Sequence, residues 1–394
     1  MSQIEVKNVY KIFGKNPKKV IPLLEKGMTK DQIHNKTGYS VGVNNVSFQV
    51  NKGEFFVVMG LSGSGKSTLI RCLNRLICAT SGEILIDGED ILKCKDDKLL
   101  EIRRKKIAMV FQNFALFPHR TICSNVEYGL EIQGIASNVR KKKAYKALKL
   151  VGLKGYEESM PDELSGGMKQ RVGLARALAT DPEILLMDEA FSALDPLIRK
   201  EMQEEMLQLQ SKMHKTVIFI THDLDEALRL GDRIAIMKDG LVEQIGTSED
   251  ILTDPASDYI KNFVQDVDRT KIITASIIME KSKAITLSKD GPKSAVRLMK
   301  DEGISSIYVT DKNRKLKGII KIEDAIELGN HGIPNVESIL ITEIPTTSPE
   351  TPISDLLSVA KDAIYPIAVV DEEHTMLGII KRSTIIAGIA GEEN

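Results

Sequence analysis

Apolar and polar positions alternate over the first two thirds of the chain in a pattern typical of a covered, largely parallel β-sheet. Three short apolar runs, 54–60, 183–190 and 216–223, each end in polar or glycine residues. The first run leads into a helical pattern over 66–77, and strands that alternate with helices favour parallel pairing. The ends of such strands, where the polar residues gather, are where parallel sheets bind ligands.

Two further patterns complete the predicted first domain. Residues 233–246 predict a β-hairpin that turns at Asp239-Gly240. Residues 112–180 are rich in helical patterns, and we expect them to form a helical subdomain. We therefore interpret residues 1–265 as one α/β domain.

After about residue 275 the sequence repeats itself with an offset of 60 residues. The segments "SSIYVTDKNRKLKGIIKIEDAI" (305–326) and "YPIAVVDEEHTMLGIIKRSTII" (365–386) align without a gap. This repeat predicts a strand–helix–strand–strand–helix unit that is present twice in tandem, as a smaller α/β module. We expect a linker over 266–275, followed by the two repeats, 276–331 and 332–394.

Composition narrows the class of protein. The chain has 394 residues, 42% of them hydrophobic, and a formal net charge of −1, which is typical of a globular protein with more than one domain. This balance does not favour nucleic acid as a partner, and the N-terminus lacks a signal pattern. No apolar run reaches the roughly 18 residues of a membrane helix, so we expect contact with a membrane only through another protein. The four cysteines form no Cys-x-x-Cys pair and indicate reduced thiols.

The segment "GLSGSGKST" (60–68) fits the phosphate-loop pattern G-x-x-x-x-G-K-[ST]. Its glycines let backbone N–H groups turn toward phosphates, and its lysine supplies positive charge to the β- and γ-phosphates. The serine hydroxyl after the lysine is a suitable ligand for Mg²⁺. A tight strand-to-helix turn alone requires neither group, so we predict an ATP site. Its residues are Gly60, Ser62, Gly63, Gly65, Lys66, Ser67 and Thr68.

A second group of polar residues follows the other apolar runs. In "ILLMDE" (184–189), Asp188 is predicted to hold Mg²⁺, and Glu189 to act on the attacking water as a base or orienting group. Without a phosphate loop, an acidic pair that caps a helix is the favoured alternative. Gln112 ends the run "KIAMVFQ" and is predicted to reach the metal and the water. His222 ends "VIFITH", where it is placed to sense the γ-phosphate.

The order phosphate loop, glutamine, "LSGGMKQ", Asp-Glu, "SALD" and histidine resembles the nucleotide-binding domain of ABC transporters, over residues 1–265. The resemblance implies an ABC-type nucleotide-binding domain, which is a phosphate-loop NTPase fold with a β-subdomain and a helical subdomain. In that family two such domains pack head to tail and enclose two ATP molecules. The resemblance implies that "LSGG" completes the ATP site of a second copy of the chain, and it implies Phe13 as the adenine-stacking aromatic, with Tyr10 as the rival. The residues implied to face the partner are Ser165, Gly166, Gly167 and Asp195.

Three features make the chain similar to the ATP-binding subunits of quaternary-amine importers. They are "MDEAFSALDPLIR" (187–199), "THDLDEALRLGDRIAIM" (221–237) and an extra segment over 14–43. Such subunits drive the uptake of glycine betaine, carnitine, choline or proline betaine. The resemblance implies an ATPase that binds the cytoplasmic face of transmembrane permease subunits, which work with a substrate-binding protein or domain.

Two other functions are compatible with the same motifs. One is an importer of another small polar solute, such as an amino acid. The chain has no tryptophan and no evident aromatic cage for a quaternary ammonium, so the substrate is inferred from the resemblance alone. The other, of a different class, is a non-hydrolysing ATP-gated scaffold. Proteins of that class tend to lose the catalytic base, whereas Glu189 is present.

The duplicated module resembles the tandem CBS pair of those subunits, with a departure at its ligand positions. The CBS pattern has Thr or Ser, then Asp three residues later, whereas the first repeat has Lys321 and keeps Asp324. The second repeat has Lys381 and then Thr384. Two lysines related by the repeat fit a doubly phosphorylated ligand such as cyclic di-AMP, and Tyr365 can stack on a base. Solvated strand ends are the alternative, and both interpretations stay open.

Overall fold

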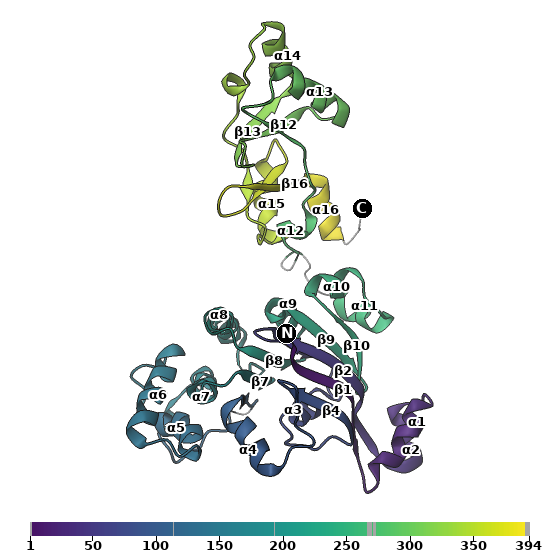
Figure 1. Ribbon diagram of the computed structural model, residues 1–394, viewed down its shortest axis with the longest axis vertical. Coiled ribbons are helices and arrows are strands. Elements are labelled where there is room, and N and C mark those ends of the chain that lie inside the picture. The colour runs from purple at the N-terminus through teal and green to yellow at the C-terminus, as the bar shows by residue number, and fades with distance from the viewer. Residues whose placement is uncertain (1, 113, 193, 266–269, 271–272, 391–394) are drawn as a thin grey trace. The chain divides into compact units, whose positions relative to one another are not determined.

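The structure is a computed structural model of the chain. It describes residues 2–112, 114–192, 194–265, 270 and 273–390 (Figure 1). Internal contacts divide the chain into two compact units, Met1–Asp266 and Val267–Asn394. Among the described residues, no helix combines the length and the apolar character needed to cross a membrane.

A six-stranded sheet forms the centre of the first unit. Its strands are β3 (Phe55–Met59), β6 (Ile107–Val110), β7 (Ile184–Asp188), β8 (Thr216–Thr221), β9 (Arg233–Lys238) and β10 (Leu241–Gly246). They lie in the order β10-β9-β3-β8-β7-β6, parallel except for the antiparallel pair of β9 and β10. All residues of β3, β7 and β8 are buried, as expected of strands covered on both faces. The predicted parallel sheet and the hairpin turning at Asp239-Gly240 are confirmed.

A second, antiparallel sheet shares a core with the first. Its strands are β1 (Ser2–Phe13), β2 (Ser40–Asn51), β4 (Ser81–Ile86) and β5 (Glu89–Asp90). They lie in the order β2-β1-β4-β5. Phe48 of β2 stacks on Phe56 of β3 at 5.0 Å, within an apolar cluster that also includes helix α3 (Lys66–Leu73). The predicted helix over 66–77 is wrong at its end, because Asn74 terminates α3 and Arg75 has a φ of 55°.

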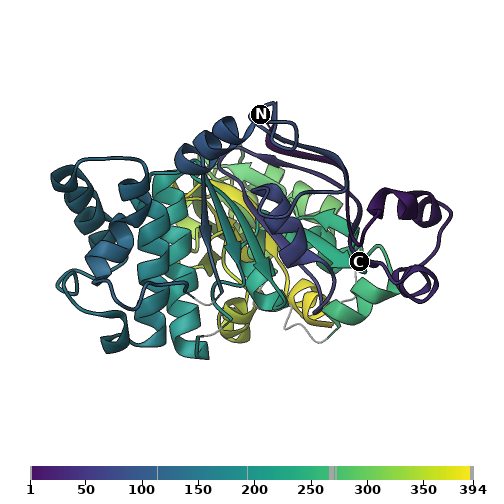
Figure 2. The same cartoon turned by 90° about the horizontal axis from the view of Figure 1, so that it is seen from below.

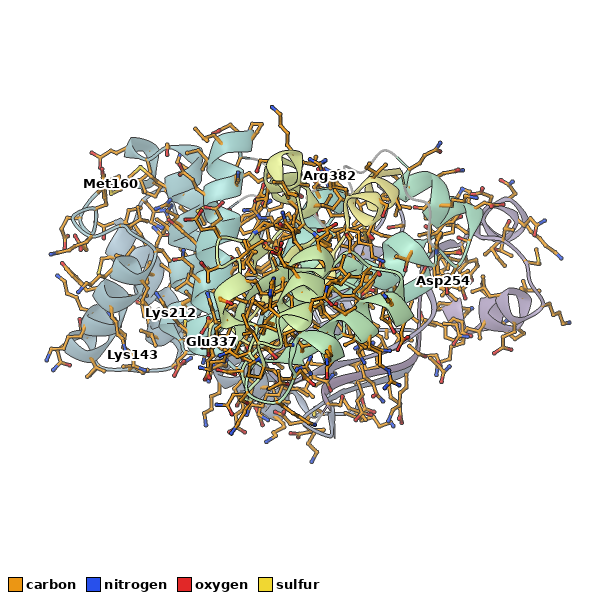
Figure 3. All side chains as sticks on the ribbon, turned by 90° about the horizontal axis from the view of Figure 1, so that it is seen from above. Lys143, Met160, Lys212, Asp254, Glu337 and Arg382 are labelled. Atoms are coloured by element: carbon orange, nitrogen blue, oxygen red, sulfur yellow. The ribbon has the colours of Figure 1, made fainter. Side chains whose placement is uncertain are left out.

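Helices cover the first unit at two opposite ends. The remaining helices are η1 (Pro17–Val20), α1 (Ile21–Glu25), α2 (Lys30–Thr37), α4 (Asp96–Lys105), α5 (Ile122–Ile132), α6 (Ser137–Leu150), η2 (Pro161–Glu163), α7 (Gly166–Ala179), α8 (Pro196–Met213), α9 (Leu224–Leu230), α10 (Ser248–Thr253) and α11 (Asp258–Val264). Helices α5, α6 and α7 pack together as the predicted helical subdomain. This subdomain, from which Lys143 and Met160 project, lies opposite the α1–α2 pair (Figures 1, 2 and 3).

The second unit contains the predicted duplication. The first repeat comprises β11 (Ala284–Thr286), α13 (Pro292–Glu302), β12 (Ser306–Thr310), β13 (Leu316–Lys321) and α14 (Ile322–Asn330). The second comprises β14 (Thr346–Thr347), α15 (Ile353–Asp362), β15 (Ile367–Val370), β16 (Met376–Ile380) and α16 (Arg382–Ala390). Two short elements, α12 (Ala275–Ile278) and η4 (Glu337–Ile339), accompany them. In each repeat the first pair of strands is parallel and the second antiparallel.

Candidate active site

The phosphate loop connects the end of β3 to the start of α3 at the carboxyl edge of the central sheet. Gly60, Gly63 and Gly65 have φ values of 149°, 77° and 104°. A Cβ at Gly60 would lie 2.2 Å from the Met237 carbonyl oxygen, and one at Gly65 would lie 2.1 Å from the Gly42 carbonyl oxygen. These two positions need glycine both for their backbone conformation and for space.

Lys66 is the buried cation of this loop. Only 4% of this residue is exposed to solvent. The Nζ atom donates to the carbonyl oxygens of Gly60 (2.7 Å) and Leu61 (3.1 Å). Burial lowers the pKa of Lys66, and the nearby Glu189 and Asp188 carboxylates oppose that shift. The Lys66 ammonium is therefore held by main-chain oxygens, and an anionic ligand can replace those oxygens as its partner.

Ser67 and Asp188 form the oxygen-rich part of the site. The Ser67 hydroxyl donates to Asp188 Oδ1 at 3.0 Å, and the Arg71 guanidinium lies 3.7 Å from Asp188 Oδ2. Burial raises the pKa of Asp188, while the Ser67 hydrogen bond and the Arg71 charge act in the opposite direction. Hard oxygen ligands in small number fit Mg²⁺, which retains water and substrate phosphate in its shell. The residues present thus fit the predicted metal.

The structure brings the three predicted catalytic residues together after β7, β8 and β6. Gln112 Nε2 donates to Glu189 Oε2 at 3.1 Å, and His222 Nδ1 lies 3.5 Å from the same oxygen. Glu189 has a φ of 47°, and its backbone N–H donates to the Ile220 carbonyl at 3.0 Å. A left-handed backbone at a non-glycine residue is uncommon and concentrates at functional sites. Glu189 is therefore held by its neighbours in a sparsely populated conformation.

The residues expected to face a partner lie apart from this site. Ser165 caps α7 and accepts from the Met168 N–H (3.3 Å), while Gly166 and Gly167 form the first turn of that helix. Asp195 caps α8 in the same way. Within the described part of the chain, no hydrogen bond or ion pair joins these residues to the phosphate loop. The N-terminus of α7 consequently presents backbone donors outward, since Ser165 and Gly166 are exposed.

Phe13 and Tyr10, the two candidates for adenine stacking, differ in exposure. Phe13 is 41% exposed at the end of β1, whereas Tyr10 is 8% exposed and packs in an apolar cluster. A Cβ at Gly42 would lie 3.0 Å from the side chains of both Phe13 and Thr68. The ring of Phe13 therefore lies beside the start of α3, where a nucleotide bound to the loop would extend.

The second unit has a cavity of about 750 Å³ between its two repeats. Lys321, Tyr365 and Lys381 line it, but Asp324 is not among its lining residues. Lys381 Nζ donates to Glu280 Oε2 at 2.7 Å, and this hydrogen bond is the main reason why the pKa of Glu280 is lowered. One of the two repeat-related lysines is thus already partnered by a carboxylate.

Comparison with known proteins places the chain in a family. Residues 43–192 match the ABC transporter family, and residues 269–330 and 336–391 match the CBS domain. A glycine betaine transport ATP-binding protein of Bacillus subtilis is 56% identical over 389 residues, which are 99% of this chain and 93% of that protein. A glycine betaine/carnitine transport ATP-binding protein of Listeria monocytogenes is 52% identical over 393 residues, which are 100% and 99%. The chain belongs to this family of ABC transporter ATP-binding subunits.

A solved structure agrees with the cassette fold of the subunit. The dimeric structure of a bacterial ABC transporter cassette matches with a TM-score of 0.53 and 35% identity, and it covers 62% of this chain and 98% of that chain. ABC cassettes act as dimers, and the first unit has the fold in which they do so. The predicted ABC-type α/β domain with a tandem CBS module is confirmed.

The sequence did not predict the contribution of three residues, two in the ABC cassette and one in the cavity between the two CBS repeats, which we call the CBS cleft. Ser192 accepts from Gln112 Nε2 (3.3 Å), although in its segment "SALD" only Asp195 was assigned a role from the sequence. Arg71 lies one turn after Ser67 on α3, a spacing that puts both on one helix face. No sequence pattern indicated Glu280, because 101 residues separate it from its partner Lys381.

Proposed function

We propose that this ABC subunit binds ATP at its phosphate loop, and the support is the arrangement of Lys66, Ser67 and Asp188. Lys66 and the loop N–H groups hold the phosphates, and Phe13 stacks on the adenine. Ser67 and Asp188 hold Mg²⁺, with Gln112 within reach of the metal. When bound, that ion neutralises charge on the β- and γ-phosphates.

Hydrolysis is assigned to the residues around Glu189. Its carboxylate orients the attacking water and accepts its proton, and the hydrogen bond from Gln112 fixes one carboxylate oxygen. His222 lies against the same oxygen and reaches toward the γ-phosphate. The strained backbone of Glu189 supports this role, since such conformations persist where function needs them.

A second copy of the chain completes each site in this proposal. Ser165, Gly166 and Gly167 donate hydrogen bonds from the N-terminus of α7 to the γ-phosphate held by the partner chain, and Asp195 crosses the same seam. The outward-facing N-terminus of α7 supports this arrangement. ATP then closes the dimer, and hydrolysis reopens it.

The transported substrate is a quaternary amine of the glycine betaine class. The observation that carries this proposal is identity of 56% and 52%, along almost the whole chain, to two ATP-binding proteins named for glycine betaine transport. The subunit lies at the cytoplasmic face of the membrane and drives import through permease subunits that work with a substrate-binding protein or domain. Closure of the dimer moves the permease helices.

Reconstitution of the complete transporter tests the substrate. We expect ATP-driven uptake of labelled glycine betaine, and competition by carnitine and by proline betaine exceeding that by proline. Lys66→Ala should abolish uptake without changing assembly. Uptake of an amino acid with no response to any quaternary amine would replace the proposed substrate, while uptake of neither would leave only the ATPase assignment.

The CBS cleft is proposed to bind cyclic di-AMP as an inhibitor. The support is a cavity of about 750 Å³, within the usual range of ligand pockets, with Lys321, Lys381 and Tyr365 in its lining. Each lysine would meet one phosphate, and Tyr365 would stack on a base. Lys381 must then exchange Glu280 for the phosphate, while Asp324 lies outside the cavity lining and is the weakest of the proposed ligand residues.

Calorimetry on the full chain tests this ligand. The Lys66→Ala background removes nucleotide binding at the phosphate loop, so that cyclic di-AMP, AMP and ATP report on the cleft alone. Replacing Lys321 and Lys381 by alanine should weaken cyclic di-AMP binding at least tenfold, since each contact is worth about 1.5–3 kcal/mol. Lys312→Ala, at an exposed lysine of the same module, is the matched control. Absence of binding, or equal affinity of the double variant, would exclude this ligand.

A further inference from the structure

The extra segment predicted over 14–43 ends earlier, at residue 39, because β2 begins at Ser40, and this insertion over 14–39 is a folded element. Leu24 and Ile33 pack against buried residues of β1 and β2. Helix α2 begins at a capping box, in which Thr29 accepts from the Gln32 N–H and Gln32 accepts from the Thr29 N–H. The ABC family match begins only after this insertion. The insertion is thus a fixed addition to the matched cassette.

Lys30 occupies an unusual place for a cation. It is the first residue of α2, where the helix dipole disfavours positive charge. Its ammonium is satisfied outside the helix: Nζ donates to the Gly63 carbonyl oxygen at 3.0 Å and lies 3.6 Å from Asp239 Oδ1. The side chain is 31% exposed. The charged side chain of Lys30 therefore contacts the phosphate loop from a position at which it does not stabilise its own helix.

The β9–β10 turn holds the neighbouring part of the loop. The Gly240 N–H donates to the Ser64 carbonyl at 2.9 Å, and the Gly240 carbonyl accepts from the Asn44 N–H at 2.8 Å. Asp239, the partner of Lys30, immediately precedes Gly240 in this turn. Two consecutive carbonyls of the phosphate loop, those of Gly63 and Ser64, are therefore held from outside.

A chain of hydrogen bonds connects these outer contacts to Lys66. The Ser64 N–H donates to the Leu61 carbonyl at 3.2 Å, and the same carbonyl accepts from Lys66 Nζ at 3.1 Å. The Gly63 carbonyl and the Ser64 N–H belong to one planar peptide group. When Lys30 fixes the carbonyl, it therefore also fixes the direction of that N–H.

We infer that Lys30 is a positioning residue for nucleotide binding, through which the insertion keeps the phosphate loop in shape before ATP arrives. The inference rests on ATP binding at the phosphate loop, as proposed above. A loop that is already ordered loses less conformational freedom when its ligand binds. Lys30 contacts the outer carbonyl and makes no hydrogen bond or ion pair to Glu189, Gln112 or His222 within the described residues. Its loss should therefore weaken ATP binding and spare the hydrolytic step.

The test is the ATPase of the assembled transporter, measured as KM and kcat for ATP. Lys30→Met retains the length of the side chain and should raise KM about three- to tenfold, with kcat changed less than twofold. Lys30→Arg, which keeps the charge, should restore KM to within twofold of the wild type. Lys36→Met, at an exposed lysine near the end of the same helix, is the matched control and should leave KM unchanged.

Asp239→Asn provides an independent arm, because asparagine tolerates the φ of 50° at this position. It should raise KM about twofold, and the double variant should show no increase beyond that of Lys30→Met, since Asp239 acts through Lys30. An unchanged KM in Lys30→Met, a loss confined to kcat, or an equal effect of Lys36→Met would overturn the inference. If Lys30→Met does not fold, the Lys30→Arg and Asp239→Asn arms decide. Absence of ATPase in the wild type would instead overturn the proposed function.

Discussion

The phosphate loop and the CBS cleft both present lysines to a space that a nucleotide can fill, but they specify a ligand to different degrees. Lys66 is buried on main-chain oxygens between glycines that have no space for a side chain. Lys381 is half exposed and paired with Glu280. A buried cation whose hydrogen bonds go to main-chain oxygens can take an anionic ligand as its partner, whereas a paired surface lysine is stable as it is. The first site is therefore defined by its residues alone, and the second depends on an exchange of partners.

The largest effect is expected at the phosphate-loop side of this comparison. Glu189→Gln should retain ATP binding and trap a closed dimer, with turnover about 10²–10⁴-fold lower, because the amide cannot accept the proton of the attacking water. Phosphate release at saturating ATP measures the loss. Glu201→Gln, at an exposed position of α8, is the control and should hydrolyse ATP normally. Near-normal release by Glu189→Gln would remove Glu189 from the role of base.

A smaller effect tests whether the ATP site is shared between two chains. A heterodimer with Ser165→Arg in one chain and Lys66→Ala in the other should keep one intact site, because head-to-tail packing puts both lesions in the same site. A chain carrying both changes, paired with the wild type, damages both sites instead. We expect the first arrangement to retain about half of the ATPase if the sites act independently, and to exceed the second in any case. Equal residual activity would exclude shared sites.

The fold was largely predictable because its signals are local. The buried strands read as short apolar runs, and the Asp239-Gly240 turn and the 60-residue repeat need no long-range information. The antiparallel sheet of β1, β2, β4 and β5 was implied only by the family resemblance, as a β-subdomain. Its strands were not delimited from the residues, because the insertion separates the first two and β1 shows no regular alternation of exposed and buried positions. The end of α3 was misplaced because apolar residues continue beyond Asn74, although the backbone turns there.

The candidate site was predictable where a motif fixes a spacing, and not where contacts span the chain. Glu189, Gln112 and His222 follow three strands of one parallel sheet, so their convergence follows from topology. The contacts of Lys30 with Gly63 and of Lys381 with Glu280 join residues 33 and 101 positions apart with no pattern between them. The sequence therefore predicted which residues meet at the candidate site, but not which residues hold them in place.

The smallest effect concerns the ion pair between Lys381 and Glu280, which distinguishes Lys381 from Lys321, the other lysine of the CBS cleft. Lys381→Met should lower the free energy of unfolding of the second unit by about 0.2–1 kcal/mol at pH 7, as is typical of exposed pairs. Amide hydrogen exchange in β16 of the full chain measures it. Lys321→Met is a closely matched control, because both lysines immediately precede a helix and lose the same unfavourable interaction with its dipole, while Lys321 has no ion pair among the described residues.

The pH dependence of that difference identifies its cause. The pKa of Glu280 is lowered from its ordinary value of 4.5, chiefly by the hydrogen bond from Lys381. Burial acts in the opposite direction, and a hydrogen bond from Thr384 adds to the lowering. The stabilisation is therefore fully present above that ordinary value and is lost as the pH falls through the lower pKa of the folded state. The gap between wild type and Lys381→Met should be constant from neutral pH down to about the ordinary value of 4.5 and should close as the pH falls further, through the lowered pKa of Glu280. A gap that persists in acid, or an equal loss in Lys321→Met, would mean that packing of the lysine stem, and not the ion pair, stabilises β16, and that exchanging Glu280 for a phosphate costs little stability.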